Sequence, residues 1–160
     1  MKRIEAIQKI MLNVSIDDII ISSPGMISRE VYAVKDRSLN FYLMGSMGAT
    51  VSVGTGLAIS SNRFVHVITG DGDVLMNLEN LVLLNKLKLP NIRVYILDNG
   101  EYATTGGQKT LSDSVDFESL YENCQVIKVE SGKGDSPRIP LKHELIKERF
   151  MKAMEECKNE

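Results

Sequence analysis

Two short polar motifs, each directly after an apolar stretch, contain the residues best suited to chemistry. They are Gly70-Asp71-Gly72-Asp73 and Asp98-Asn99-Gly100. Glycine lacks a Cβ, so the backbone at Gly70 and Gly72 can turn tightly and approach a ligand. A helix beginning near Asp73 would present unpaired N–H groups and the positive end of its dipole to an anion. Because Asp71 and Asp73 place negative charge there too, an anion at this point requires a divalent cation between it and the carboxylates.

Magnesium is the cation that fits this combination. It takes oxygen ligands in octahedral geometry and usually completes its shell with ligand phosphates. We expect Asp71 and Asn99 to supply two protein ligands, and a main-chain carbonyl within 99–101 to supply a third. Either motif alone is more often a plain turn, but the two together indicate a metal–diphosphate site.

The elements around these motifs are the ones that would bring them together. Residues 64–69 form an apolar, β-rich run that stops at the first motif, and residues 92–97 form a second run that leads into the other. The spacing of apolar residues between them predicts a helix from residue 73 to Pro90. Strand, turn, helix and strand in this order place both motifs at the carboxyl edge of a parallel sheet, where open sheets bind ligands.

The rest of the chain continues the alternation of strands and helices. Further strands are expected at 18–22, 40–44 and 125–129, and further helices at 2–13, 28–35, from about 48 onward, 116–121 and 142–157. Ser28 is the expected N-cap of its helix, and the last helix should bury Leu145, Ile146, Phe150 and Met154. The pattern predicts one α/β domain over 1–160: a three-layer, doubly wound parallel sheet with helices on both faces.

Composition excludes several classes of partner. The chain has 160 residues, 43% of them hydrophobic, and a formal net charge of −2, so it offers no basic patch for nucleic acid. No apolar run is long enough to span a bilayer. Its two cysteines, Cys124 and Cys157, are too few for a disulfide framework or an iron–sulfur site and are typical of reduced thiols in a cytoplasmic protein.

Gly70-Asp71-Gly72 followed by Asn99 resembles the cofactor motif of thiamine diphosphate (ThDP)-dependent enzymes. The resemblance implies the ThDP-binding fold, in its diphosphate-binding (PP) domain, with Mg²⁺ held by Asp71, Asn99 and the main chain of Glu101. The family usually has two asparagines where this chain has Asp98-Asn99. A register shifted by one residue would make Asp98 the ligand instead.

Two further segments resemble the same family. Gly45-Ser46-Met47-Gly48 matches the loop that cradles the bent cofactor, where the carbonyl of Gly45 would accept from the aminopyrimidine and Met47 would hold the two rings apart. Residues 22–30 match an "xxxG-xx-SRE" segment of phosphonopyruvate and sulfopyruvate decarboxylases, which implies that Gly25 borders the diphosphate. Arg29 in this segment is either a site residue or a solvated charge.

The loop after Asn99 is the most family-specific stretch. It contains the "TGGQ-x-T" segment of the same decarboxylases, so Tyr102, Thr105 and Gln108 are expected near cofactor or substrate. With Gly70, Gly72 and Asp73 these residues complete the implied cofactor site, and the resemblance spans about residues 18–120. His66, between valines of a strand, is expected to be a packed residue without a catalytic role. Gly54 and Gly56 are expected to allow tight packing of their helix on the sheet.

The glutamate that activates ThDP lies, in this family, on a separate pyrimidine-binding domain that this chain lacks. The resemblance therefore implies the diphosphate-side subunit of a split decarboxylase acting on sulfopyruvate or phosphonopyruvate, inactive alone and working as a hetero-oligomer with a pyrimidine-side partner. Half of a 2-oxo acid dehydrogenase or transketolase-like enzyme would share the metal motif, and an oxoacid:ferredoxin oxidoreductase subunit would add iron–sulfur cysteines. A non-catalytic ThDP-binding regulatory subunit is the remaining alternative.

Overall fold

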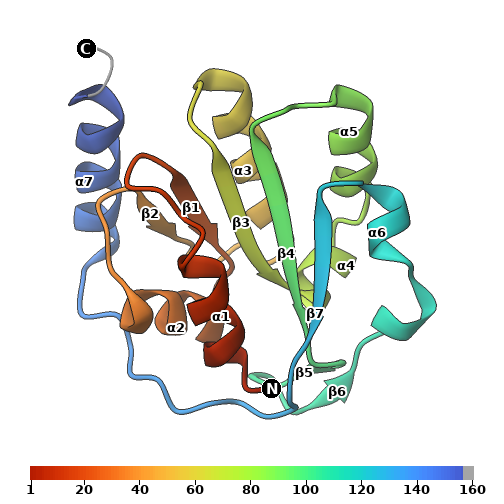
Figure 1. Ribbon diagram of the computed structural model, residues 1–160. Coiled ribbons are helices and arrows are strands. Elements are labelled where there is room, and N and C mark those ends of the chain that lie inside the picture. Colours follow the sequence, from red (N-terminus) through yellow and green to blue (C-terminus); the bar gives the residue numbers. More distant parts are fainter. Residues whose placement is uncertain (157–160) are drawn as a thin grey trace.

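Five parallel strands form the central sheet, in the order β2-β1-β3-β4-β7 (Figure 1). The structure is a computed structural model and describes residues 1–156. The strands of this sheet are β1 (Ile19–Ser22), β2 (Asn40–Tyr42), β3 (Val65–Gly70), β4 (Ile92–Asp98) and β7 (Cys124–Lys128). The predicted class, an α/β fold on a parallel sheet, is therefore confirmed.

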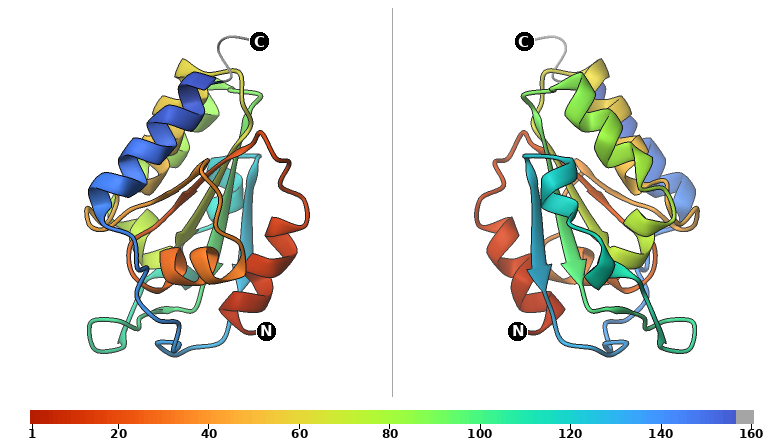
Figure 2. Two further views of the ribbon diagram at one scale, coloured as in Figure 1. Left: turned by 90° about the vertical axis from the view of Figure 1, so that its left-hand side faces the viewer. Right: turned by 90° about the vertical axis from the view of Figure 1, so that its right-hand side faces the viewer.

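Helices cover both faces of the sheet (Figure 2). One face carries α1 (Arg3–Met11) and α2 (Met26–Val34), which pack against each other. The opposite face carries α3 (Thr50–Ser60), α5 (Glu79–Leu87), α6 (Phe117–Leu120) and α7 (His143–Glu156). Short elements at the carboxyl edge complete the fold: α4 (Asp71–Leu75), the hairpin strands β5 (Glu101–Tyr102) and β6 (Gln108–Lys109), and the 3₁₀ turn Ser112–Ser114.

The core consists of two apolar layers separated by the sheet. In β1, Ile19 and Ile21 belong to the layer under α3 and α5, whereas Ile20 belongs to the layer under α1 and α2. All three are fully buried. A strand buried on both faces needs a continuous apolar run, which is why β1 and the other central strands could be recognised from the sequence.

Two helix predictions need correction. Helix α2 begins at Met26, with Gly25 as its N-cap at a φ of 84°, so Ser28 lies inside the helix and does not cap it. The single helix expected from residue 73 begins at Asp71 and is divided into α4 and α5. Between them the N–H of Asn77 donates to the carbonyl of Val74, as in a tighter turn. A Cβ added at Gly48 would be crowded by the Cβ of Met76, which lies between α4 and α5. The break between the two helices therefore packs closely against the loop after β2.

Helix α7 buries fewer residues than its spacing predicts. Ile146 and Phe150 are buried, but Leu145 is 46% exposed, and Met154 is partly buried. The prediction for Leu145 is wrong because the apolar stripe of this helix faces only the edge of the sheet beside β2, where Phe150 packs on Phe41. Cys124 is a buried free thiol, and Cys157 lies outside the described residues. Within residues 1–156, no helix combines the length and the apolar character needed to cross a bilayer.

The two glycines of α3 differ in their surroundings. A Cβ added at Gly54 would lie well inside van der Waals distance of Cγ2 of Val67 in β3, whereas one added at Gly56 would meet open space. The prediction of tight helix–sheet packing is thus confirmed at Gly54 and wrong at Gly56.

This contrast gives a matched pair of substitutions. We expect Gly54→Ala to lower the free energy of unfolding by about 1–3 kcal/mol, because the added methyl overpacks the contact with Val67. Gly56→Ala should raise it by about 0.5–1 kcal/mol, because alanine is the better helix former in open space. Urea unfolding of both variants checks this. Equal effects of the two substitutions would contradict the packing at Gly54.

Candidate functional site

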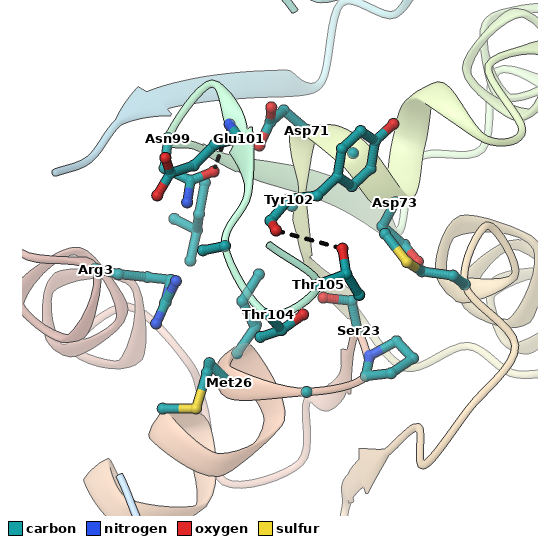
Figure 3. A pocket seen from close by; sticks show the side chains of 18 residues that line it. Arg3, Ser23, Met26, Asp71, Asp73, Asn99, Glu101, Tyr102, Thr104 and Thr105 are labelled. Carbon is teal, nitrogen blue, oxygen red and sulfur yellow. Dashed lines mark hydrogen bonds between the residues drawn. The ribbon is translucent and has the colours of Figure 1, made fainter. Parts of the chain in front are cut away.

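A cavity of about 170 Å³ opens at the carboxyl edge of the sheet, between the ends of β1 and β3 (Figure 3). The chain leaves β1 toward β2 on one side and later returns to β3 on the other, so this is the point where the strand order reverses. Ligands of open α/β sheets bind at such points. The walls come from five segments: Arg3 of α1, 23–27 after β1, Met47 after β2, 70–73 at the end of β3, and Leu97, Asn99 and 101–105 at and after the end of β4.

The three expected metal ligands lie at one side of this cavity. Asp71 is 2% exposed, and its Oδ2 accepts from Oγ1 of Thr110 at 2.5 Å. Asn99 and Glu101 lie beside it in the loop after β4 (Figure 3). The amide oxygen of Asn99 accepts from the N–H of Glu101 at 3.2 Å, and an amide oxygen has a second lone pair for a cation.

Glu101 contributes its main chain more readily than its carboxylate. The carboxylate accepts from the N–H of Gly132 at 2.7 Å and so holds the segment after β7. Within residues 1–156, no three or more His, Cys, Asp or Glu side chains form a metal-binding cluster. One buried carboxylate, one amide oxygen and one main-chain carbonyl nevertheless match the oxygen ligands of Mg²⁺, which leaves the remaining positions to phosphate and water.

Burial raises the pKa of Asp71 above its ordinary value, although the hydrogen bond from Thr110 opposes this, and the nearby carboxylate of Asp98 raises it further. The charged form of Asp71 is therefore disfavoured in the protein alone. A cation bound at this carboxylate would stabilise its charged form and lower its pKa.

Asp98 already accepts from three donors. Its Oδ1 accepts from the N–H of Gly100 at 2.9 Å and from the hydroxyl of Ser112 at 3.0 Å, and its Oδ2 pairs with Nζ of Lys128 at 2.5 Å. These contacts favour Asn99 over Asp98 as the ligand from this strand end.

Asp73 holds two segments of the chain together. It is buried, and its two oxygens accept from the hydroxyl of Thr69 at 2.6 Å and from the N–H of Gly48 at 2.7 Å. It therefore ties the loop after β2 to the end of β3. Although Asp73 lines the cavity, its carboxylate is better placed to hold this loop than to bind a cofactor directly.

Of the three predicted residues in the loop that Asp73 holds, only Met47 lines the cavity. Met47 lines the cavity and is 46% exposed, while Gly45 and Ser46 are exposed beside it without lining it. Ser46 has a φ of 62°, an uncommon conformation for a residue with a side chain. The turn therefore presents Met47 to the cavity, and its contact with the cofactor stays a prediction.

The loop after β4 folds over the cavity as a small hairpin. The ring of Tyr102 occupies the space where Gly72 would carry a Cβ, so only glycine fits at Gly72. Tyr102 and Thr105, which were predicted to lie near cofactor or substrate, line the cavity, and the hydroxyl of Thr105 donates weakly to the carbonyl of Tyr102 at 3.4 Å. Gln108 lies in β6, exposed and outside the cavity wall.

Several wall residues were not predicted from the sequence. Arg3, Ser23, Met26 and Thr104 line the cavity together with Gly25, the residue that was predicted from this loop. Arg3 lies in a helix far from both motifs in the sequence. Its position in the cavity wall depends on how α1 packs on α2, and no local sequence pattern predicts that packing. The other three lie next to motif residues and could have been included on that ground.

His66 lies away from the cavity, near the amino end of β3. It is buried, its Nε2 lies 3.0 Å from Oδ2 of Asp18, and its ring stacks on Tyr95. Burial lowers its pKa, although Asp18 opposes that shift. This is a packed histidine, in agreement with the prediction.

The fold and the cavity define the chain as an α/β domain with its cavity at the switch point of a parallel sheet. Residues 22–156 match the family model "Thiamine pyrophosphate enzyme, C-terminal TPP binding domain". The chain belongs to this family.

Individual relatives agree with this assignment. The chain is 44% identical over 124 residues to the sulfopyruvate decarboxylase subunit beta of Methanocaldococcus jannaschii, matching 77% of this chain and 66% of that one. It is 38% identical to the subunit beta of Methanothermobacter thermautotrophicus over 95% of both chains. It is 38% identical over 122 residues to the phosphonopyruvate decarboxylase of Streptomyces viridochromogenes, of which the match covers only 31%.

Among solved structures, the ThDP-dependent 4-hydroxybenzoylformate decarboxylase of Rhodococcus jostii RHA1 shares the fold. The TM-score is 0.68 at 16% sequence identity, and the match covers 84% of this chain and 33% of that one. The chain thus spans about two thirds of one subunit relative, nearly all of another, and about a third of the long decarboxylases.

Proposed function

We propose that this chain is the diphosphate-side subunit of a split decarboxylase that uses ThDP and Mg²⁺. The observation that carries the proposal is the meeting of Asp71, Asn99 and the main chain of Glu101 at one cavity at the switch point of the sheet. The similarity to sulfopyruvate decarboxylase β subunits and to phosphonopyruvate decarboxylase supports the substrate class: a 2-oxo acid that carries a second anionic group.

In this proposal each part of the cavity has a separate task. Asp71, Asn99 and the carbonyl of Glu101 would hold Mg²⁺ on the diphosphate. Met47 would support the bent cofactor, and Tyr102 and Thr105 would close the loop over it and exclude water. When bound, ThDP supplies the stabilised carbanion that lets a 2-oxo acid lose CO₂.

We place the activating glutamate on a pyrimidine-side partner, so that the working enzyme is a hetero-oligomer. The subunit naming of the relatives supports the existence of such a partner. The free, buried thiol of Cys124 is consistent with work in the cytoplasm.

Reconstitution tests the proposal. The chain alone, with ThDP and Mg²⁺, should release no CO₂ from sulfopyruvate or phosphonopyruvate. Adding the short subunit that co-purifies with it from its host should restore turnover of one of them. Robust turnover by the chain alone would exclude the split arrangement. A complex that binds ThDP but decarboxylates neither acid would favour a non-catalytic ThDP-binding subunit.

A further inference from the structure

A second cavity of about 240 Å³ lies directly beside the first and shares Gly25 with it. Two arginines, Arg29 and Arg138, contribute the only charged side chains in its wall, and no Asp or Glu lines it. Leu43, Met44 and Ile139 form the apolar part of the wall. A cavity with two positive charges and no negative one, next to a cofactor site, is arranged to receive an anion.

The two guanidinium groups differ from most other arginines in this protein because they have no carboxylate partner. Arg3 donates twice to Glu30, at 2.7 and 2.8 Å, and Arg149 donates twice to Asp36. Within the part of the chain that the structure describes, Arg29 and Arg138 form no ion pair.

Among residues 1–156, the side chain of Arg29 forms one hydrogen bond, and it is weak. Its Nη1 lies 3.7 Å from the sulfur of Met26, and a thioether is a poor acceptor. Arg29 is partly buried on α2, so its guanidinium has lost part of its hydration without gaining a strong partner. An incoming oxyanion would therefore not have to displace a carboxylate.

Arg138 reaches this place through the segment between β7 and α7. This segment crosses from one edge of the sheet to the other, along the carboxyl side and past α1 and α2 (Figures 1 and 2). The carbonyl of Lys133 accepts from Nη2 of Arg3 at 3.1 Å, and the N–H of Gly132 donates to Glu101. These two bonds fix the start of the segment against α1 and against the loop of the cofactor cavity.

We propose that the Arg29–Arg138 cavity binds the terminal sulfonate or phosphonate group of the 2-oxo acid. This inference rests on the proposed function. A tetrahedral oxyanion has three oxygens, which two guanidinium forks can engage at once. The apolar wall lowers the local dielectric and strengthens that attraction. The cavity would select acids with a second anionic group over simple 2-oxo acids such as pyruvate.

Binding of small oxyanions to the full chain tests the inference without any activity. Methylphosphonate and methanesulfonate are titrated separately while the Nε–H signals of arginine are followed by NMR, with pyrophosphate and Mg²⁺ present to fill the diphosphate site. We expect saturable shifts of the Arg29 and Arg138 signals. Arg29→Gln or Arg138→Gln should weaken binding about tenfold or more, since a hydrogen bond to a charged group is lost. The probe that binds more tightly indicates whether a phosphonate or a sulfonate fits.

Arg93→Gln is the matched control, because Arg93 is exposed and lies in β4 outside this cavity. It should leave the affinity unchanged. Absence of saturable binding, or equal affinity of wild type and both cavity variants, would overturn the inference.

The assembled complex separates this inference from the proposed function. In each cavity variant the ratio of kcat/KM for sulfopyruvate or phosphonopyruvate to that for pyruvate should fall about tenfold or more. An active complex with an unchanged ratio would overturn the assignment of the cavity but not the decarboxylase. A complex without decarboxylase activity would overturn the proposed function, and the oxyanion titration would then decide on the cavity by itself.

Discussion

Replacing Asp71 with alanine is expected to weaken Mg²⁺-dependent binding of ThDP roughly 100-fold or more. The substitution removes the one carboxylate of the proposed ligand set, and loss of even an outer-shell partner costs about 10- to 100-fold in metal sites. It also leaves the hydroxyl of Thr110 without the acceptor it has at 2.5 Å. Calorimetric titration of ThDP at several Mg²⁺ concentrations, on the chain and on the complex, measures the effect.

Two further variants make this prediction specific. Asn99→Ala should weaken binding in the same direction, because it removes the amide oxygen from the same site. Asp113→Ala is the control, since Asp113 is exposed and does not line the cofactor cavity. Unchanged affinity in both Asp71→Ala and Asn99→Ala would show that the diphosphate is held elsewhere.

Replacing Asp73 with alanine is expected to lower the free energy of unfolding by about 2–4 kcal/mol. The buried carboxylate is the acceptor for Thr69 and for the N–H of Gly48, and its loss leaves two buried donors without partners. Urea unfolding measures the loss. Hydrogen exchange of the Gly48 amide should accelerate beyond the global change, because this amide would lose its acceptor even in the folded protein.

Thr69→Val distinguishes the two hydrogen bonds of Asp73, the one from Thr69 and the one from Gly48. It removes the donor at β3 but keeps the bond to Gly48, so the loop after β2 should stay protected and the destabilisation should be smaller, about 1 kcal/mol. Equal protection of the Gly48 amide in wild type and Asp73→Ala would contradict the role assigned to Asp73. If the loop supports the cofactor through Met47, Asp73→Ala should also weaken ThDP binding more than Thr69→Val does.

The central strands and the family could be predicted from the sequence because both depend on short, local patterns. Strands buried on two faces must be apolar throughout, and the motif Gly70-Asp71-Gly72-Asp73 needs only a strand and the turn that follows it. The site residues that surround these motifs were predicted from the resemblance. Among them, the structure places Met47, Tyr102 and Thr105 in the cavity wall and Gly45 and Ser46 outside it.

What could not be predicted depends on contacts between distant segments. The division between α4 and α5 follows from close packing of Met76 against Gly48, and the arrival of Arg3 follows from the packing of α1 on α2. Ser28 was misassigned as a cap because its hydroxyl is used differently: it donates to the carbonyl of Ser23 at 2.8 Å, inside the first turn of α2. Leu145 shows that spacing alone does not tell which face a helix at a sheet edge will bury.

The strand order also has a consequence for synthesis on the ribosome. Each strand pairs with one that is already made: β2 and β3 with β1, β4 with β3, and β7 with β4. The sheet can therefore grow in the order in which the chain emerges, without waiting for distant partners. The segment after β7 also contacts a part of the chain that is already made, but a distant one, since Lys133 accepts from Arg3. The wall that carries Arg138 is thus added after all the residues that line the neighbouring cofactor cavity have been synthesised.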